Sequence, residues 1–420
     1  MIEQVWAALG GDPAELDRLT TTGPARTLRS RFPVTEFGTA TIGAALLAAG
    51  DRPVGIDTRQ AAVALRSERH LLVDGVSPGD PFDPLSAFHR TSDGWIRLHA
   101  NYPWHAAAAR EVLGEDPAAA IADWRKVDLE TALHEAGGVA AATRTEEEWA
   151  ATDAGQAARA LPLVERRRIG EAAPRPSGRI RVLDLTRVIA GPVATRTLAA
   201  HGADVLRIDP PHRPELPAQA WETLPGKRSA IAELPLPDLL AGADVVVSGY
   251  RPGALDRFGL APEDLAETHP GLVVVTLSAW GHTGPWAHRR GFDSLVQSAC
   301  GIGLVEGGPG ALPAQVLDHA TGYLGAAAAL LAVADQRRSG GTHHVRLALA
   351  GTAAFLQSLP RTEPETVDNA VDQAVDIDPA PYLESLGRLT IASPPGTVDG
   401  QPLHWPSVPE PGAASPTWPP

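Results

Sequence analysis

Residues 181–209, RVLDLTRVIAGPVATRTLAAHGADVLRID, contain the pattern from which the fold class can be predicted. Two short apolar runs, at 181–185 and 204–209, predict buried strands, and the segment between them predicts a helix that Gly202 ends. Apolar runs of the same kind follow at 243–248 and 272–277. Short apolar strands that alternate with helices are typical of βαβ units, so the sequence predicts an α/β protein with a parallel, doubly wound, Rossmann-like sheet. In such sheets the ligand site lies at the carboxyl ends of the strands.

A change of composition near residue 170 indicates that the chain has several parts. Residues 171–180 combine two prolines with small residues, which is typical of a linker. Before it, residues 86–100 predict two strands around the turn Ser92-Asp93-Gly94, and residues 105–163 predict helices. The predicted parts are a smaller α+β part at 1–170, the linker at 171–180, the Rossmann-like part at 181–360 and a Pro-rich extended or partly disordered tail at 361–420.

The overall composition excludes several classes of protein. The net charge of −14 argues against a nucleic-acid surface, although a few local cations would suffice for an anionic cofactor. We expect no membrane span, because no apolar run reaches the roughly 20 residues that a bilayer requires. The N-terminus lacks the features of a secretory signal. A single cysteine, Cys300, excludes an internal disulfide, so the expected location is the cytoplasm.

Two cofactor classes are also disfavoured. The turn after the first strand of the sheet reads Ala190-Gly191-Pro192 and lacks the Gly-x-Gly-x-x-Gly of nicotinamide dehydrogenases. The histidines nearest one another in sequence do not have the spacing of a helical metal pair, so we expect no metal site.

Five motifs, in order, resemble those of the family III CoA-transferases, which include formyl-CoA and carnitine-CoA transferases. They are the stretch 181–209, Gly226-Lys227-Arg228-Ser229, the segment 249–260, the pair 281–285 with 290–293, and Leu317-Asp318-His319-Ala320-Thr321-Gly322. The family's asparagine is replaced by glycine at positions 226 and 249.

The resemblance implies that Asp318 is the catalytic nucleophile. A carboxylate can attack an acyl-CoA thioester, because CoA thiolate leaves readily, and a mixed anhydride results. Thiolate then attacks the aspartyl carbonyl to give an aspartyl-CoA thioester, and an acceptor acid reverses these steps. Acyl-CoA and a carboxylic acid would be the partners, with no permanently bound cofactor. Without the resemblance, an aspartate ahead of a helix is more often an N-cap.

Other residues are assigned to the site by their positions in the same motifs. An oxyanion needs donors from the backbone or from small polar side chains, and CoA carries phosphates that attract arginine and lysine. The oxyanion and substrate residues are Val188, Ile189, Ala190, Phe292 and Gln297, and the CoA-binding residues are Lys227, Arg228, Arg257 and Phe258. For Arg228, a solvated surface charge is an equal alternative.

The first 175 residues resemble the family in a different order. Residues 91–96 look like the hairpin that opens the family's small domain, and 43–49 echo 325–331. Aligning Gly43 on Gly325 places Glu36 opposite Asp318. The chain therefore resembles the rear of one family unit joined to the front of another. This order is compatible with an interlocked homodimer or with a single chain that forms the same shell.

Two other functions stay open. The family's α-methylacyl-CoA racemases use a histidine where this chain has Phe292, and phenylalanine cannot accept a proton, so the racemase reading is disfavoured. The displaced halves and the two substituted asparagines also permit a non-catalytic CoA-binding subunit.

Overall fold

A seven-stranded sheet forms the centre of the protein, whose computed structural model describes residues 1–79, 82–362 and 377–419. The strand order is β10-β9-β8-β11-β12-β13-β7. The strands are β7 (Glu165–Gly170), β8 (Arg181–Leu185), β9 (Asp204–Asp209), β10 (Arg228–Ile231), β11 (Val245–Ser248), β12 (Val273–Ser278) and β13 (Thr342–Ala348). All neighbours are parallel except the edge strand β7, which is antiparallel to β13. The predicted α/β class with a parallel sheet is confirmed.

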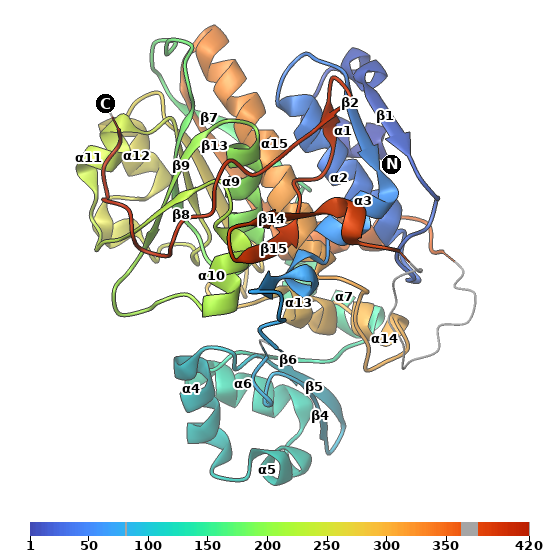
Figure 1. Cartoon of the computed structure of the whole chain (residues 1–420). Coiled ribbons are helices and arrows are strands. Elements are labelled where there is room, and N and C mark those ends of the chain that lie inside the picture. The colour runs from blue at the N-terminus through green and yellow to red at the C-terminus, as the bar shows by residue number, and fades with distance from the viewer. Residues whose placement is uncertain (80–81, 363–376, 420) are drawn as a thin grey trace.

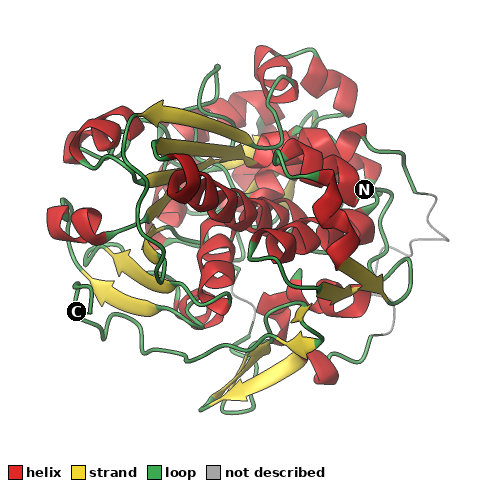
Figure 2. Ribbon diagram, turned by 90° about the horizontal axis from the view of Figure 1, so that it is seen from above, coloured by secondary structure: helices red, strands yellow, loops and turns green. Residues whose placement is uncertain are grey.

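Helices cover both faces of this sheet (Figures 1 and 2). Alternate strand residues face opposite sides, so Val245 and Val247 join one core while Val246 joins the other. The first face carries α9 (Ala190–Ala200), α15 (Val316–Ser339) and α16 (Leu349–Ser358), and the second carries α11 (Pro237–Gly242) and α12 (Pro262–Thr268). Shorter helices beside them are α10 (Pro217–Thr223), α13 (Asp293–Ala299) and α14 (Ile302–Val305).

The long helix α15 runs through the middle of the protein. Among the described residues, it is the one helix with the length and hydropathy of a membrane span, and 89% of its apolar window is buried inside the protein. Figure 1 shows it between α9 and α2 (Val34–Ala48), and it packs against both. Burial on two sides explains why residues 320–334 of α15 are almost all apolar or small, with no polar stripe.

The segments around α2 repeat the order found around α15. After α2 come β2 (Val54–Asp57) and α3 (Thr58–Ala64), just as β13 and α16 follow α15. Glu36 lies in the first turn of α2, and Asp318 lies in the first turn of α15. This helix–strand–helix repeat agrees with the internal similarity between 43–49 and 325–331, and the structure places its two copies side by side. The other N-terminal elements are α1 (Ile2–Ala8), β1 (Leu19–Thr22) and β3 (Leu72–Val73).

A small lobe projects from the main body at the bottom of Figure 1. It contains the antiparallel strands β4 (Phe88–Thr91), β5 (Gly94–Leu98) and β6 (Ala140–Ala142), covered by α4 (Pro103–Leu113), α5 (Pro117–Asp123) and α6 (Lys126–Glu135). The predicted hairpin and the helices after it are thus present. The part predicted at 1–170 is not one unit, because β7 belongs to the main sheet and α2 packs on α15. The connecting helices are α7 (Glu146–Ala150) and α8 (Asp153–Arg159).

The C-terminal segment contains short strands as well as extended chain. They are β14 (Leu383–Leu386), β15 (Leu389–Ala392), β16 (Thr397–Val398) and β17 (Gln401–Pro402). β15 pairs with β3, and β16 pairs with β2. The alternating Leu389 and Ile391, together with Trp405, bury enough apolar surface to order this part of the tail that was predicted as extended or disordered. Residues 363–376 of the predicted tail lie outside the described residues.

Candidate active site

Asp318 is the third residue of α15 and is buried. The helix is N-capped by Gln315, so the simple N-cap reading of Asp318 does not apply. Its backbone N–H donates to Asp293 Oδ2 at 3.0 Å, whereas its own Oδ2 has no hydrogen-bond partner within the described chain. A buried carboxylate oxygen without a donor is costly to maintain and is typical of a reactive group rather than a structural one.

Other carboxylates surround Asp318 and change its acidity. Burial, and then the carboxylates of Asp293 and Glu68, raise the pKa of Asp318 well above its ordinary range. Burial also raises the pKa of Asp293 to about 6. Glu68 Oε2 lies 3.5 Å from Nε2 of His319, the residue after Asp318. A carboxylate that is poorly solvated and repelled by neighbouring negative charges is more basic, and therefore a better nucleophile once it is ionised.

A cavity of about 560 Å³ opens beside these carboxylates. Glu68 and Asp293 border it, and Ala314 and Gln315 bring it to the start of α15. The N-terminal half of the chain contributes Glu68 and Phe82, the small lobe contributes Arg97, and the Rossmann-like part contributes Asp293. All of these come from one chain.

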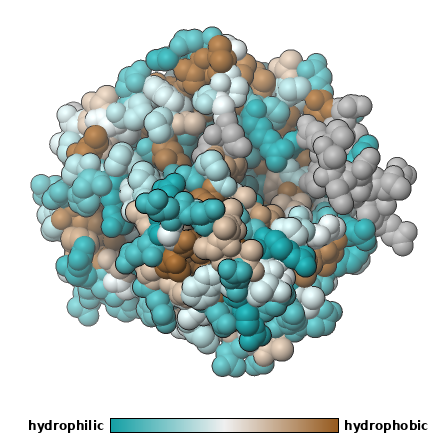
Figure 3. Space-filling model, turned by 90° about the horizontal axis from the view of Figure 1, so that it is seen from below, coloured by the Kyte–Doolittle hydropathy of each residue, from teal (hydrophilic) through white to brown (hydrophobic). Residues whose placement is uncertain are grey.

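The face of the protein that is seen from below has hydrophilic and hydrophobic residues side by side (Figure 3).

The turn before α9 approaches the same face of α15. Gly322 lies one helical turn after Asp318, and a Cβ at this glycine would meet the Ala190 carbonyl oxygen at 2.6 Å. Ile189 is buried and Ala190 is half-buried in this turn. The predicted oxyanion turn therefore lies close to the nucleophile's helix, while the role of Ile189 and Ala190 as donors stays a prediction.

Val188 does not fit the oxyanion role assigned to it. Its N–H donates to Glu215 Oε2 at 3.0 Å, so the donor is already used. The residue has a φ of 69°, a left-handed conformation that a β-branched side chain adopts only under strain. Gln219 Nε2 donates to the Val188 carbonyl at 2.9 Å, and these two bonds hold the strained turn in place.

Gln297 and Phe292 both lie beside Asp293. Gln297 lines the cavity, but its amide nitrogen donates to Asp293 Oδ1 and its oxygen accepts from Leu312 N–H at 2.8 Å. It therefore orients Asp293, and a role as a direct oxyanion donor is not supported. The Phe292 ring stacks on His99 of the small lobe, with 3.7 Å between the ring centroids.

Sequence reasoning missed the two histidines that meet Phe292. Burial lowers the pKa of His99 to about 3, and burial likewise lowers the pKa of His105 to about 3, so both rings are neutral at pH 7. A local signal did exist: Arg97 and His99 alternate with the apolar Ile96 and Leu98 along the predicted hairpin, which puts them on one face.

Lys227 and Arg228 are not free to bind CoA phosphates, which corrects the prediction from their motif. Lys227 is fully buried, and its Nζ lies 3.0 Å from Asp184 Oδ2 and 3.1 Å from the Pro192 carbonyl. Arg228 pairs with Asp204 at 3.0 Å and donates to the Thr417 carbonyl at 2.8 Å. Both cations support the fold.

Arg257 is exposed, and its guanidinium carbon lies 4.6 Å from the centroid of the half-buried Phe258 ring. This cation–π contact holds the side chain on the surface while the charge remains in water. The assignment of both residues to CoA stays a prediction.

A cluster of arginines that the sequence did not single out faces the small lobe. The guanidinium carbons of Arg187 and Arg213 lie 5.5 Å and 5.3 Å from the Trp104 ring centroid. Burial, and then Arg251 and Arg213, lower the pKa of Arg290, which shows that these charges are near one another. We call Arg187, Arg213, Arg251 and Arg290 the arginine cluster.

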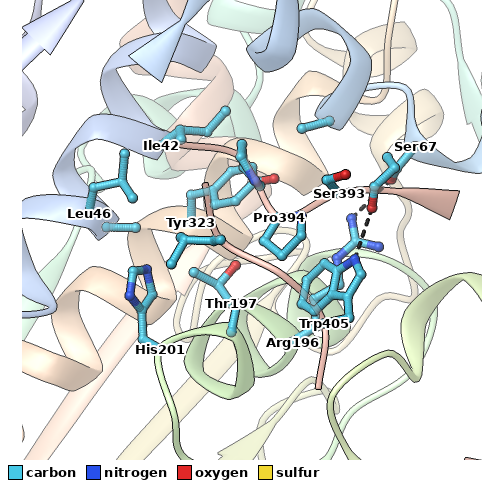
Figure 4. Close-up of a pocket in the computed structure, with 16 residues that line it drawn as sticks. Ile42, Leu46, Ser67, Arg196, Thr197, His201, Tyr323, Ser393, Pro394 and Trp405 are labelled. Carbon is cyan, nitrogen blue, oxygen red and sulfur yellow. Dashed lines mark hydrogen bonds between the residues drawn. The ribbon is translucent and has the colours of Figure 1, made fainter. Parts of the chain in front are cut away.

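A second pocket, of only about 10 Å³, lies under the C-terminal segment (Figure 4). Its volume has room for about one water molecule. Arg196 on its wall donates to Ser67 Oγ at 2.9 Å, and Trp405 covers the guanidinium. Ser67 precedes Glu68, so this packing fixes the segment that brings Glu68 to the active-site cavity.

The chain is similar in sequence to known CoA-transferases. The model of CoA-transferase family III matches residues 178–376. A probable fatty acyl-CoA transferase of Mycobacterium tuberculosis is 30% identical over 266 residues, which cover 55% of this chain and 67% of that protein. A succinyl-CoA–D-citramalate CoA-transferase of Chloroflexus aurantiacus is 30% identical over 210 residues, covering 44% of this chain and 52% of the relative.

The crystal structure of the Mycobacterium tuberculosis protein Rv3272 is similar at 31% identity with a TM-score of 0.40, covering 44% of this chain and 59% of that one. The chain thus spans between about half and two thirds of the length of these relatives. Because the family model matches the Rossmann-like part, and the match to the first relative extends over two thirds of that protein, this chain belongs to CoA-transferase family III.

Proposed function

We propose that the protein transfers CoA between an acyl-CoA thioester and a carboxylic acid through a covalent intermediate on Asp318. The observation that carries the proposal is the buried Oδ2 of Asp318, which has no hydrogen-bond partner among the described residues and lies beside a cavity large enough for a substrate. Family membership supports the reaction class.

The chemistry needs only groups of the chain and the two substrates. Ionised Asp318 attacks the thioester carbonyl, the C–S bond of the resulting adduct breaks, and CoA leaves as thiolate while a mixed anhydride of Asp318 and the acyl group remains. The thiolate then attacks the aspartyl carbonyl, which releases the first acid as a carboxylate and leaves an aspartyl-CoA thioester. The acceptor carboxylate attacks that thioester, which releases CoA thiolate and gives a second mixed anhydride. The thiolate then attacks the acceptor's acyl carbonyl in this anhydride, which forms the new acyl-CoA and releases the Asp318 carboxylate. Each step is a nucleophilic exchange at a carbonyl, so electrons and charge balance without a redox partner.

The arginine cluster is the best supported site for the CoA phosphates. Guanidinium groups bind phosphate oxygens with paired hydrogen bonds, and clustered cations are relieved of mutual repulsion by an anion. His105 links the cluster to the nucleophile, since it contacts Phe292, the residue before Asp293. We propose that CoA extends from the cluster past Phe292 toward Asp318.

One chain suffices for this site in our proposal. Glu68 and Arg97, from the first half of the sequence, line the same cavity as Asp293. The rearranged order therefore joins, within one polypeptide, groups that a two-chain assembly would bring from separate copies. A homodimer is compatible with the site but is not required to line it.

Mass spectrometry after incubation with a panel of acyl-CoAs tests the proposal. Reduction with borohydride, or hydroxylamine trapping, should mark a peptide that contains Asp318, and the mark should be absent from Asp318→Ala. Measurable CoA binding with no adduct from any donor would instead favour a binding subunit. An adduct on another carboxylate would reject Asp318 as the nucleophile.

The acidity of the Asp293–Asp318 pair predicts the pH dependence of adduct formation. Only the ionised carboxylate attacks, and the pKa of Asp318 is raised. The single-turnover rate should therefore be constant at high pH and fall about tenfold per unit below a transition that lies well above the ordinary carboxyl pKa of about 4. In Asp293→Asn the like charge is gone, so the transition should move to lower pH. A rate that is flat from pH 5 to pH 8 would contradict the pair's role.

A second candidate, proton exchange beside the thioester, is favoured by one observation. The neutral imidazole of His99 stacks on Phe292, the position at which the family's racemases carry a histidine. Incorporation of deuterium at the α-carbon in heavy water, lost in His99→Gln, would support this reaction. An absence of exchange with donors that do form the adduct would reject it.

A further inference from the structure

We infer that the active-site cavity takes dicarboxylic substrates and that Arg97 binds the carboxylate remote from the reacting one. The inference rests on the proposed function, because it names the class of acyl group and acceptor acid for that site. Its basis is a cation on the cavity wall that lacks an acidic partner among the described residues.

The strand β5 directs Arg97 into the cavity. Ile96 and Leu98 point into the core of the small lobe, so Arg97 and His99 share the opposite face. His99 on this face stacks on Phe292, and Phe292 precedes Asp293. Arg97 therefore lies two residues before His99, whose stacking on Phe292 fixes the position of the hairpin. Because Arg97 is part of strand β5, its backbone is held by the sheet.

Within residues 1–79, 82–362 and 377–419, the charge of Arg97 has no acidic partner. Its guanidinium carbon lies 4.9 Å from the Phe88 ring centroid, and its buried Nε has no hydrogen-bond acceptor in the described part of the chain. Burial lowers the pKa of Arg97. By contrast Arg144, another buried arginine at the lobe, is paired with Glu130 at 2.6 Å. An unpaired cation in a cavity is destabilising until an anion enters, and the Phe88 ring pre-orients it for one.

A carboxylate is the anion that fits this position. A guanidinium offers parallel N–H groups that match the two oxygens of a carboxylate. The wall near the nucleophile carries Glu68 and Asp293, which repel a free carboxylate but tolerate an uncharged thioester. A dicarboxylic acyl-CoA meets both requirements when its thioester lies toward Asp318 and its free carboxylate pairs with Arg97. CoA phosphates are the other source of negative charge, and we assign them to the arginine cluster.

The test compares Arg97→Gln with a matched control from the same hairpin, Arg90→Gln. Arg90 also lies over an aromatic ring, 5.4 Å from the Trp95 centroid, but it is exposed and does not line the cavity. Donors of equal length are glutaryl-CoA and valeryl-CoA, which differ in the terminal carboxylate. The ratio of kcat/KM for glutaryl-CoA over valeryl-CoA should fall about a hundredfold in Arg97→Gln and stay within about twofold in Arg90→Gln, as expected for the loss of one partner from a desolvated ion pair.

A binding measurement separates this inference from the proposed function. By calorimetry, glutarate should bind the wild-type protein at least tenfold more tightly than valerate, and Arg97→Gln should remove that preference. If glutarate binds through Arg97 but no adduct forms on Asp318, the transfer mechanism fails and the carboxylate site stands. If adducts form but the wild type shows no preference for glutaryl-CoA, the inference about Arg97 fails alone.

Two further outcomes are informative. Equal losses on both donors in Arg97→Gln would show that Arg97 serves CoA itself, which overturns the inference. Should Arg97→Gln fail to fold, Arg97→Lys provides the same test, because lysine keeps the charge without the paired donors. An intermediate fall of about tenfold in the ratio is then expected, and an unchanged ratio would reject carboxylate binding.

Discussion

Replacing Asp318 with asparagine is expected to abolish adduct formation and, at the same time, to raise the stability of the protein at pH 8. Asparagine is not a nucleophile in this reaction, so the activity should fall by at least about a thousandfold, as for removal of other covalent nucleophiles. The gain in stability follows from the raised pKa of Asp318, because the folded protein must keep an unfavourable buried charge at high pH. We expect a gain of about 1–2 kcal/mol in the free energy of unfolding.

The sign of this effect depends on pH. A carboxyl group whose folded-state pKa is raised contributes stability that is fully present below its unfolded pKa, near 4, and is lost as the pH rises through the folded pKa. Asparagine does not titrate, so the advantage of Asp318→Asn should be large at pH 8 and small at pH 4. Urea denaturation at both pH values measures it. A variant less stable than the wild type at pH 8 would show that Asp318 has a stabilising partner.

Replacing Asp184 with alanine should destabilise the protein by about 3–5 kcal/mol at pH 7. Asp184 is fully buried and accepts hydrogen bonds from Thr186 and Thr195, the latter at 2.6 Å, as well as from Lys227. Without it the Lys227 ammonium would keep only the Pro192 carbonyl, with Arg207 nearby. Leaving a buried cation without its anion destabilises the folded protein by more than the intact ion pair stabilises it.

The pH again separates explanations for Asp184→Ala. Burial lowers the pKa of Lys227 to about 8 even in the presence of Asp184, so in the variant this side chain should lose its proton more readily. The destabilisation should therefore shrink at pH 9. A double variant, Asp184→Leu with Lys227→Met, removes both charges and should recover most of the loss. A loss below 1 kcal/mol for Asp184→Ala at pH 7 would mean that the pair is not desolvated.

The sequence predicts those features that depend on local pattern. Runs such as Val245–Ser248 are recognisable because a parallel strand buried on both faces must be apolar throughout. Asp318 can be proposed as the nucleophile from the sequence because the motif that contains it is local. The placement of Lys227 could not be found in this way, since a motif shows which residue is present and not whether its charge faces solvent or Asp184.

The missed residues belong to contacts between distant parts of the chain. Glu68, Arg97 and His99 meet the active site only because α2 packs on α15 and the small lobe packs on α13. The pattern of apolar and polar residues within 60–100 does not indicate that these residues lie near α13 and α15. The tail illustrates the same limit: its prolines favour extended chain, but its pairing with β2 and β3 is visible only when the first seventy or so residues are in place.

The packing of α2 against α15 also has a consequence for synthesis on the ribosome. Nearly all of α2 is apolar and becomes buried, yet α15 begins at Val316, long after Ala48 has been added. At about 5–20 residues per second, the face of α2 that packs on α15 must stay uncovered for roughly 15–60 s, although α1, β2 and α3 can already contact the other sides of the helix. We therefore expect the newly made N-terminal segment to depend on chaperones, and a fragment that stops before α15 to aggregate more readily than the full chain.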